Sequence, residues 1–315
     1  MSSFWVFPGQ GAQQAGMLHA LPGDPLVREC LRQASEVLDE DVLELDSPQA
    51  LQATREVQLC LLIAGVACAR VLMARGSAPD YVAGLSIGAY PAAVIAGALS
   101  FADALRLVAL RGELMQRAYP QGYGMTALMG LDQGVIERLV AQVHGPHSPV
   151  YLANINADNQ FVIAGSDQAM ADVATLAKGE GAAMAKRLAV SVPSHCELLN
   201  EPAQALAQAL AQVTLQAPTL KYLSGSTARP VFTADKLRED LAYNMCRLID
   251  WRSTVQTAYE RGARLQIELP PGAVLTGLAR RVFGNGLEQG SAVAFQGARL
   301  DTLSALSREE ECRHP

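Results

Sequence analysis

The sequence predicts an α/β fold built on a mostly parallel sheet. Short apolar runs of strand length alternate with longer segments in which apolar residues recur at helical spacing. This alternation is typical of helices packed on both faces of a parallel sheet. Hydrophobic residues make up 50% of the 315 residues and charged residues 18%, which excludes a disordered or fibrous chain. At roughly 150 residues per domain, the length predicts two domains or one large one.

The first part of the chain shows strands and helices in the expected order. Phe4-Trp5-Val6-Phe7 is an apolar run that ends at a glycine loop, so it predicts a buried strand entering a turn. Further along, the pattern predicts a helix, a short strand and two more helices: residues 57–73, 81–83, from Gly88 to about Ala98, and 101–118. Residues 81–102 carry no charge and are long enough to span a bilayer. Their glycines and Pro91 favour instead a buried strand, a tight turn and a buried helix.

Residues 122–190 predict a small domain of a different kind. Their pattern predicts a strand, a helix, two strands, a helix and a strand: 125–131, 133–143, 150–155, 160–164, 167–178 and 183–189. This is the split βαβ order of a ferredoxin-like unit. We therefore expect an insert in a discontinuous large domain made of residues 1–121 and 191–315. The polar tail, residues 307–315, is expected to be frayed.

Charge and cysteine content exclude several classes of protein. The 31 acidic residues exceed the 25 basic ones, and no dense Lys/Arg run occurs, so binding to nucleic acid is not expected. The N-terminus lacks a basic segment before an apolar stretch, so it does not predict a signal or transit peptide. The six cysteines form no CxxC pair, which argues against a zinc knuckle or redox motif. Free thiols in a cytoplasmic protein fit this pattern.

Gly84-Leu85-Ser86-Ile87-Gly88 is a candidate nucleophile turn. It matches GxSxG between an apolar strand and a helix, where such a turn lifts the serine Oγ out of the sheet. A serine hydroxyl needs a base, and His195 is the best candidate because its proline-punctuated loop returns the insert to the large domain. The other histidines follow the glycine loop or lie in a polar loop or the tail: His19, His144, His147 and His314. An ordinary turn and a surface-loop histidine are the alternatives.

The glycine loop and Arg111 each allow two interpretations. Pro8-Gly9-Gln10-Gly11 resembles a phosphate cradle, but Gln14 stands at the third glycine position of GxGxxG, and no Gly-Lys-Ser/Thr follows. A backbone N–H donor to an oxyanion is the better use of this loop. Arg111 falls on a mainly apolar predicted helix, where a guanidinium is costly unless it meets an anion. An ordinary surface arginine is the alternative.

Six motifs fall in order across nearly the whole chain: Phe7-Pro8-Gly9-Gln10-Gly11-Ala12-Gln13, the turn at Ser86, Arg111-Gly112 with Met115-Gln116, Ala153-Asn154-Ile155-Asn156 with Val162-Ile163-Ala164-Gly165, Val192-Pro193-Ser194-His195, and Pro271-Gly272-Ala273-Val274-Leu275-Thr276-Gly277-Leu278. Together they resemble the malonyl-CoA:acyl carrier protein transacylases. The resemblance implies an α/β-hydrolase-like large domain with a parallel sheet and a ferredoxin-like insert. It also implies a cleft between the two that holds the serine.

The resemblance implies the catalytic roles. Ser86 would be the nucleophile and His195 its base. A backbone carbonyl, rather than an acid, would orient the histidine; the family takes it from a Gln or Asn about seven residues before an aromatic residue. Here that aromatic resembles Trp251, and the spacing gives Asn244.

Substrate binding is likewise implied by the resemblance. The N–H groups of Gln10 and Ile87 would form the oxyanion hole, Arg111 would bind the malonyl carboxylate, and Gln58 would line the acyl pocket. The substrates would be malonyl-CoA and the prosthetic-group thiol of an acyl carrier protein. No metal or bound cofactor is expected.

Departures from the family pattern favour one branch of the family. The family commonly has His before the serine and Glu after the second glycine, whereas this chain has Leu85 and Ala89; the usual Gly-Pro-Gly is Pro270-Pro271-Gly272. The turn is more similar to the epsilon subunit of biotin-independent malonate decarboxylase, with other subunits of that enzyme as further partners. The transacylase of fatty-acid synthesis is the alternative. A serine esterase and a catalytically silent scaffold subunit are more distant ones.

Carrier docking is expected to need a local basic patch. Carriers served by this family are typically acidic and this chain has a net charge of −6, so the net charges repel. Two close-set pairs are candidates for the cleft mouth: Lys186 with Arg187, and Arg280 with Arg281. Ordinary solvated surface is the alternative.

Overall fold

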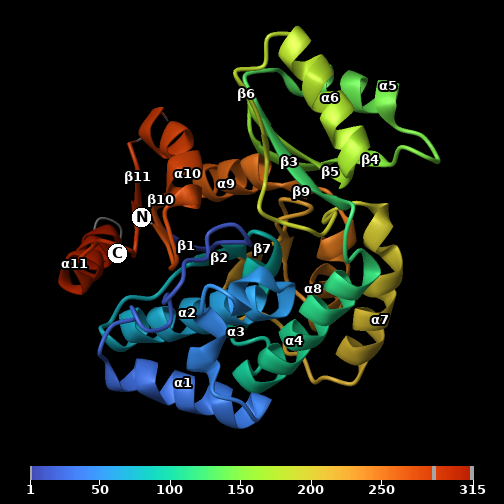
Figure 1. The fold of residues 1–315 in the computed structure, drawn as a ribbon. Helices are drawn as coiled ribbons and strands as arrows, with labels where there is room; N and C mark the ends of the chain where they lie inside the picture. The colour runs from blue at the N-terminus through green and yellow to red at the C-terminus, as the bar shows by residue number, and fades with distance from the viewer. Residues whose placement is uncertain (1, 286–288, 313–315) are drawn as a thin grey trace.

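The computed structural model describes residues 2–285 and 289–312, and these form a mixed α/β architecture with two sheets (Figure 1). The α/β class predicted from the sequence is therefore confirmed. The detailed likeness to hydrolases and to ferredoxin stays a prediction. His314, expected in the tail, lies outside the described residues.

The larger sheet has six strands in the order β11 (Ser291–Ala294), β10 (Ala263–Glu268), β1 (Ser2–Phe7), β2 (Tyr81–Gly84), β7 (Lys221–Leu223) and β8 (Pro230–Val231). Neighbours are parallel except at the β7–β8 edge. Phe7 at the end of β1 pairs with Gly84 at the end of β2. The glycine loop and the GxSxG turn therefore emerge side by side at the carboxyl edge of the sheet, where ligands bind in open α/β folds.

Both faces of this sheet are buried, as the apolar run in β1 predicts. Trp5 and Phe7 face one core, while Phe4 and Val6 face the other, because successive side chains of a strand alternate. The first core also contains buried residues of α1 (Pro25–Leu38), α2 (Thr54–Ala74), α3 (Ala89–Ile95), α4 (Phe101–Ala118), α7 (Asn200–Ala211) and α8 (Ala234–Tyr243). The second core contains residues of α9 (Trp251–Glu260) and α10 (Val274–Asn285).

Helix α2 is the central helix of the first core. Its length and apolar composition would allow it to cross a membrane, but 83% of its most apolar window is buried inside the protein. Buried side chains occur all round it, from Val57 to Leu72, as expected for a helix enclosed by other elements. The apolar segment 81–102 forms β2, the turn and α3, as the sequence predicts.

The second sheet stands above the carboxyl edge of the first (Figure 1). Its order is β6 (Met184–Arg187), β3 (Tyr123–Met129), β5 (Gln160–Ser166), β4 (Val150–Ala157) and β9 (Ile249–Asp250). Helices α5 (Gln133–Val143) and α6 (Asp167–Gly179) pack on its outer face. The strand and helix order predicted for residues 122–190 is present. Strand β9 comes from outside those residues, so the second sheet extends beyond the predicted insert.

The C-terminal segment differs from the sequence prediction. Residues 307–312 belong to α11 (Leu300–Cys312) rather than to a frayed tail. Leu303 and Ser307 are buried, and the Ser307 hydroxyl donates to the Leu303 carbonyl. The prediction of a frayed tail is wrong for residues 307–312. It was based on their polar composition, but one apolar stripe is enough to hold an amphipathic helix on a core.

The two glycines of GxSxG lie where main-chain segments approach each other too closely for a side chain. A Cβ on Gly84 would lie 1.8 Å from the carbonyl carbon of Gly88, and one on Gly88 would lie 2.1 Å from the carbonyl oxygen of Phe7. Neither contact can be relieved by a side-chain rotation, since both partners are backbone. The turn therefore requires glycine at both positions.

We predict that Gly88→Ala destabilises the protein by at least about 1–3 kcal/mol, the usual cost of overpacking. Gly277→Ala is the matched control: it lies in α10 with nothing within 4 Å of the added Cβ, so about 0.5–1 kcal/mol of stabilisation is expected there. Urea unfolding followed by circular dichroism measures both. Equal midpoints for Gly88→Ala and the wild type would contradict the steric argument.

Candidate active site

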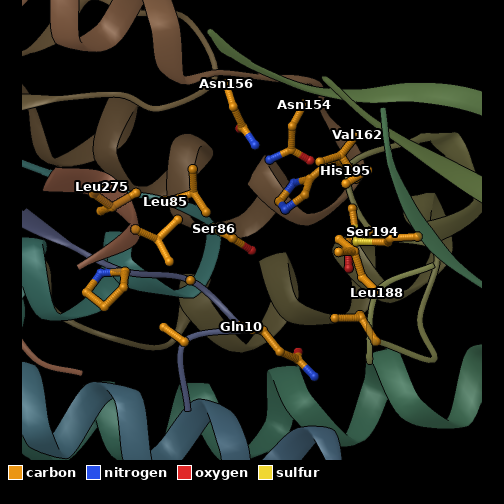
Figure 2. Close-up of a pocket in the computed structure, with 18 of the residues that line it drawn as sticks. Gln10, Leu85, Ser86, Asn154, Asn156, Val162, Leu188, Ser194, His195 and Leu275 are labelled. Atoms are coloured by element: carbon orange, nitrogen blue, oxygen red, sulfur yellow. The ribbon is translucent and has the colours of Figure 1, made fainter. Parts of the chain in front are cut away.

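A cavity of about 240 Å³ lies between the carboxyl edge of the first sheet and the second sheet (Figure 2). The glycine loop and the GxSxG turn form one side of it, strands β3, β4 and β5 another, and the segment after β6 a third. Its polar lining consists of Gln10, Ser86, Asn154, Asn156, Gln160, Ser194 and His195. The predicted nucleophile and base thus line one cavity.

Ser86 occupies the strained position of the turn. Its φ is 57°, a left-handed conformation that non-glycine residues adopt at a cost. It begins the short helix η3 (Ser86–Gly88), which leads directly into α3. Figure 2 shows the hydroxyl turned into the cavity. The Oγ accepts a hydrogen bond from Nη2 of Arg111 at 3.3 Å.

His195 is held by main-chain contacts. Its φ is 65°, its N–H donates to the Met245 carbonyl at 2.7 Å, and its Nδ1 lies 2.7 Å from the Asn244 carbonyl oxygen. A carbonyl only accepts, so Nδ1 carries the proton and Nε2 is left as the proton acceptor. The predicted pairing of His195 with the backbone of Asn244 is present in the structure.

The surroundings of His195 keep it neutral. Burial lowers its pKa, the hydrogen bond to the Asn244 carbonyl opposes part of that shift, and the charge of Arg111 adds to it, so that the pKa is about 4. At neutral pH the imidazole is therefore unprotonated, the state that a general base requires.

Arg111 is a buried cation with neutral partners. Its side chain is fully buried, Nη1 donates to Gln58 Oε1 at 2.8 Å, and Nη2 donates to Asn244 Oδ1 at 3.1 Å. Burial lowers the pKa of the guanidinium to about 10, so it stays charged at neutral pH. Its Nε has no hydrogen-bond partner within the described residues. Of the two interpretations of Arg111, the structure thus excludes a surface arginine.

The two predicted oxyanion donors lie on neighbouring loops. Ile87 follows Ser86 at the start of η3, and Gln10 lines the cavity in the glycine loop. These loops touch, because a Cβ on Gly9 would lie 2.8 Å from Leu85 Cδ2. Backbone N–H groups at a helix N-terminus favour a developing negative charge. Their function as an oxyanion hole stays a prediction.

The predicted docking cations lie on two elements, β6 and α10. All four are exposed. Arg187 differs from a free surface cation: its guanidinium donates to the carbonyls of four residues and pairs with Asp167 (Tyr123, Met125, Leu188 and Val190). It therefore ties β6 to β3 and to the segment leading to His195. Arg281 donates to Asn159 Oδ1 at 3.4 Å.

Asn154 and Asn156 are cavity residues to which the sequence analysis gave no function. They stand two apart on β4 and thus on one face of the strand, and both line the cavity (Figure 2). Their buried Oδ1 atoms have no partner within the part of the chain that the structure describes. The signal was available in two asparagines that stand two positions apart at the end of the predicted strand 150–155. Leu85, noted as a departure from the family, also lines the cavity.

This arrangement suits acyl transfer, in which a hydroxyl, a neutral base and N–H donors surround the carbonyl that reacts. Comparison with known proteins agrees: the chain belongs to the acyl transferase domain family, whose pattern matches residues 4–300.

Individual relatives and solved structures indicate which kind of acyl transferase the chain is similar to. The malonyl CoA-acyl carrier protein transacylase of Escherichia coli (strain K12) is 37% identical over 302 residues, covering 92% of this chain and 97% of that protein. That of Haemophilus influenzae is 38% identical over 287 residues, covering 89% and 92%. The structure of the transacylase from Coxiella burnetii has a TM-score of 0.90 at 35% identity and covers 100% of this chain and 98% of that one.

A further similar structure contains a carrier. It is a type II polyketide synthase acyl-carrier protein in complex with its malonyl-transacylase, with a TM-score of 0.88 at 36% identity, covering 99% of this chain and 100% of that one. None of these four is described as a malonate decarboxylase subunit, so the comparisons favour the alternative, the malonyl CoA-acyl carrier protein transacylase, over that branch.

We predict that the acylation rate stays level from pH 8 down to about 5, because at pH 5, one unit above the His195 pKa of about 4, most of the imidazole is still unprotonated. As pH falls through 4, protonation removes the base and the rate drops. The measurement is kcat/KM for p-nitrophenyl acetate, which carries no carboxylate of its own. An acid limb centred near 6.5, the ordinary histidine value, would contradict the burial argument.

Proposed function

We propose that this acyltransferase moves a malonyl group from malonyl-CoA to the thiol of an acyl carrier protein through an ester on Ser86. The observation that carries the proposal is the buried guanidinium of Arg111, whose hydrogen-bond partners are all neutral and which lies 3.3 Å from Ser86 Oγ. A buried cation of this kind favours an acyl group that brings its own carboxylate. The relatives' names support the same substrate and carrier.

The first half-reaction forms the ester. As Ser86 Oγ attacks the thioester carbonyl carbon, its proton passes to His195 Nε2, and the carbonyl oxygen becomes an oxyanion. The N–H groups of Gln10 and Ile87 would hold that oxyanion. The C–S bond then breaks, the electron pair leaves on sulfur, and the imidazolium returns the proton to the CoA thiolate. Each atom and proton is accounted for without a metal or redox group.

The second half-reaction reverses these steps. The carrier thiol gives its proton to His195 and attacks the ester carbonyl; Ser86 Oγ leaves and takes the proton back. Water would give hydrolysis at this stage instead. Turnover of malonyl-CoA to free malonate without a carrier would therefore indicate the esterase alternative.

The identity of the carrier is a separate question. The comparisons support an acyl carrier protein of the kind that the relatives serve. Leu85 and Ala89 favour the malonate decarboxylase branch as a second candidate, and Leu85 lies in the cavity wall. Mass spectrometry of the acylated carrier decides between them: ordinary phosphopantetheine supports the first candidate, and a ribosylated dephospho-CoA group the second.

Incubation with malonyl-CoA should place the mass of one malonyl group on the peptide that contains Ser86, because this hydroxyl combines the strained turn with the cavity. Peptide mapping by mass spectrometry makes the measurement, with Ser86→Ala as the control. A label that survives in Ser86→Ala, or a folded protein that takes no label at all, would overturn the proposed function; the latter outcome would favour a silent scaffold.

Arg111→Ala should lower kcat/KM for malonyl-CoA by about 10- to 150-fold, the cost of losing a hydrogen bond to a charged group, and narrow the preference for malonyl over acetyl. Arg106→Ala, on the same helix but exposed, is the matched control and should leave both rates unchanged. If the malonyl-to-acetyl ratio in Arg111→Ala equals that of the wild type, another residue reads the carboxylate.

A further inference from the structure

Asn244 contacts three functional groups at once. Its carbonyl accepts from His195 Nδ1 at 2.7 Å, its Oδ1 accepts from Arg111 Nη2 at 3.1 Å, and its Nδ2 donates to the main-chain carbonyl of Ser86 at 3.3 Å. Only the first of these contacts was expected. The side chain is 3% exposed, so water competes little for the other two.

The Asn244 side chain binds the charged guanidinium of Arg111 through an uncharged oxygen. The guanidinium is fully buried, and the three oxygens that accept from it are two carboxamide oxygens and one hydroxyl oxygen: Gln58 Oε1, Asn244 Oδ1 and Ser86 Oγ. Among the described residues it forms no ion pair with Asp or Glu. A carboxylate in the place of either carboxamide would supply the missing counter-ion from within the protein.

We propose that the Asn244 side chain is a positioning residue that sets the acyl specificity: it holds Arg111 beside Ser86 with an oxygen that carries no charge, and so reserves the guanidinium for the carboxylate of the substrate. A carboxamide can do this, because its oxygen accepts from the arginine while its NH₂ donates to the Ser86 carbonyl. A carboxylate of the same shape provides no such donor and neutralises the cation. This inference rests on the proposed function.

Asn244→Asp is the sharpest test because the two side chains have nearly the same shape. The main-chain carbonyl that orients His195 remains. An internal ion pair with Arg111 should compete with the malonyl carboxylate, so we expect KM for malonyl-CoA to rise and the malonyl-to-acetyl ratio of kcat/KM to fall by about 10-fold or more, the scale of one hydrogen bond to a charged group. The acetyl rate should fall much less than the malonyl rate.

Asn244→Gln is the matched control. It restores a neutral carboxamide, at the cost of one methylene, and should retain most of the malonyl preference. Gln58→Glu is an independent variant: it places a carboxylate on the other nitrogen, Nη1, through a side chain whose hydrogen bonds go to Met115 and Arg111 rather than to the turn. We expect the same direction of change as in Asn244→Asp.

The readout is acylation of Ser86 by malonyl-CoA and by acetyl-CoA in parallel, with thermal unfolding to show that each variant is folded. A ratio that falls in Asn244→Asp and Gln58→Glu but not in Asn244→Gln supports the inference. If both acidic variants keep the wild-type ratio, or if all three lose both activities equally, the specificity role is overturned and Asn244 is only structural. If the wild-type protein is acylated equally well by malonyl-CoA and acetyl-CoA, the proposed function itself is contradicted, because Arg111 then does not select for the malonyl carboxylate.

Discussion

The close approach of main-chain segments at the ends of β1 and β2 is the constraint on which the site depends. Phe7 and Gly84 are paired in parallel register, and a Cβ on Gly88 would lie 2.1 Å from the Phe7 carbonyl oxygen. This proximity places the start of η3 beside the glycine loop. Parallel pairing of two short apolar strands thus brings together the turn that holds Ser86 and the loop that holds Gln10, the two segments from which the proposed nucleophile and oxyanion donors come.

Burial then gives the polar groups their properties. Burial lowers the pKa of His195 to about 4 and so leaves its imidazole unprotonated at neutral pH. The same burial leaves Arg111 charged among neutral partners, which is unfavourable until an anion arrives. One physical cause, burial, therefore shifts the pKa of both the proposed base, His195, and the proposed specificity group, Arg111. The free-energy cost of burying the Arg111 charge without a counter-ion is present in the empty site, and binding of a carboxylate would offset it.

The sequence predicts the order of strands and helices along the chain further than it predicts the side-chain contacts of the site. Periodicity predicted β1, α4 and α5 closely, because these elements are apolar on the faces they bury. The contacts of the Asn244 side chain join residues 133 and 158 positions apart, and no local pattern encodes such pairs. Arg187 shows the same limit: like its neighbour Lys186 it is exposed, yet its guanidinium donates to main-chain carbonyls that only the fold brings near.

The second sheet and His195 are connected through the segment that holds Asn244. Residues 244–246 form the short helix η5, and β9 follows almost at once and pairs in parallel with β4, the strand of Asn154. The carbonyl that orients His195 and the wall opposite Ser86 are thus fixed by one stretch of chain. The acyl group and the carrier thiol of the proposed reaction would both meet this same buried site. Leu85 lines the cavity and departs from the family motif, whereas Lys186 and Arg280 are exposed and are not among the residues that line the cavity. Because the buried groups serve the transfer itself, we expect exposed residues of this kind to select the carrier.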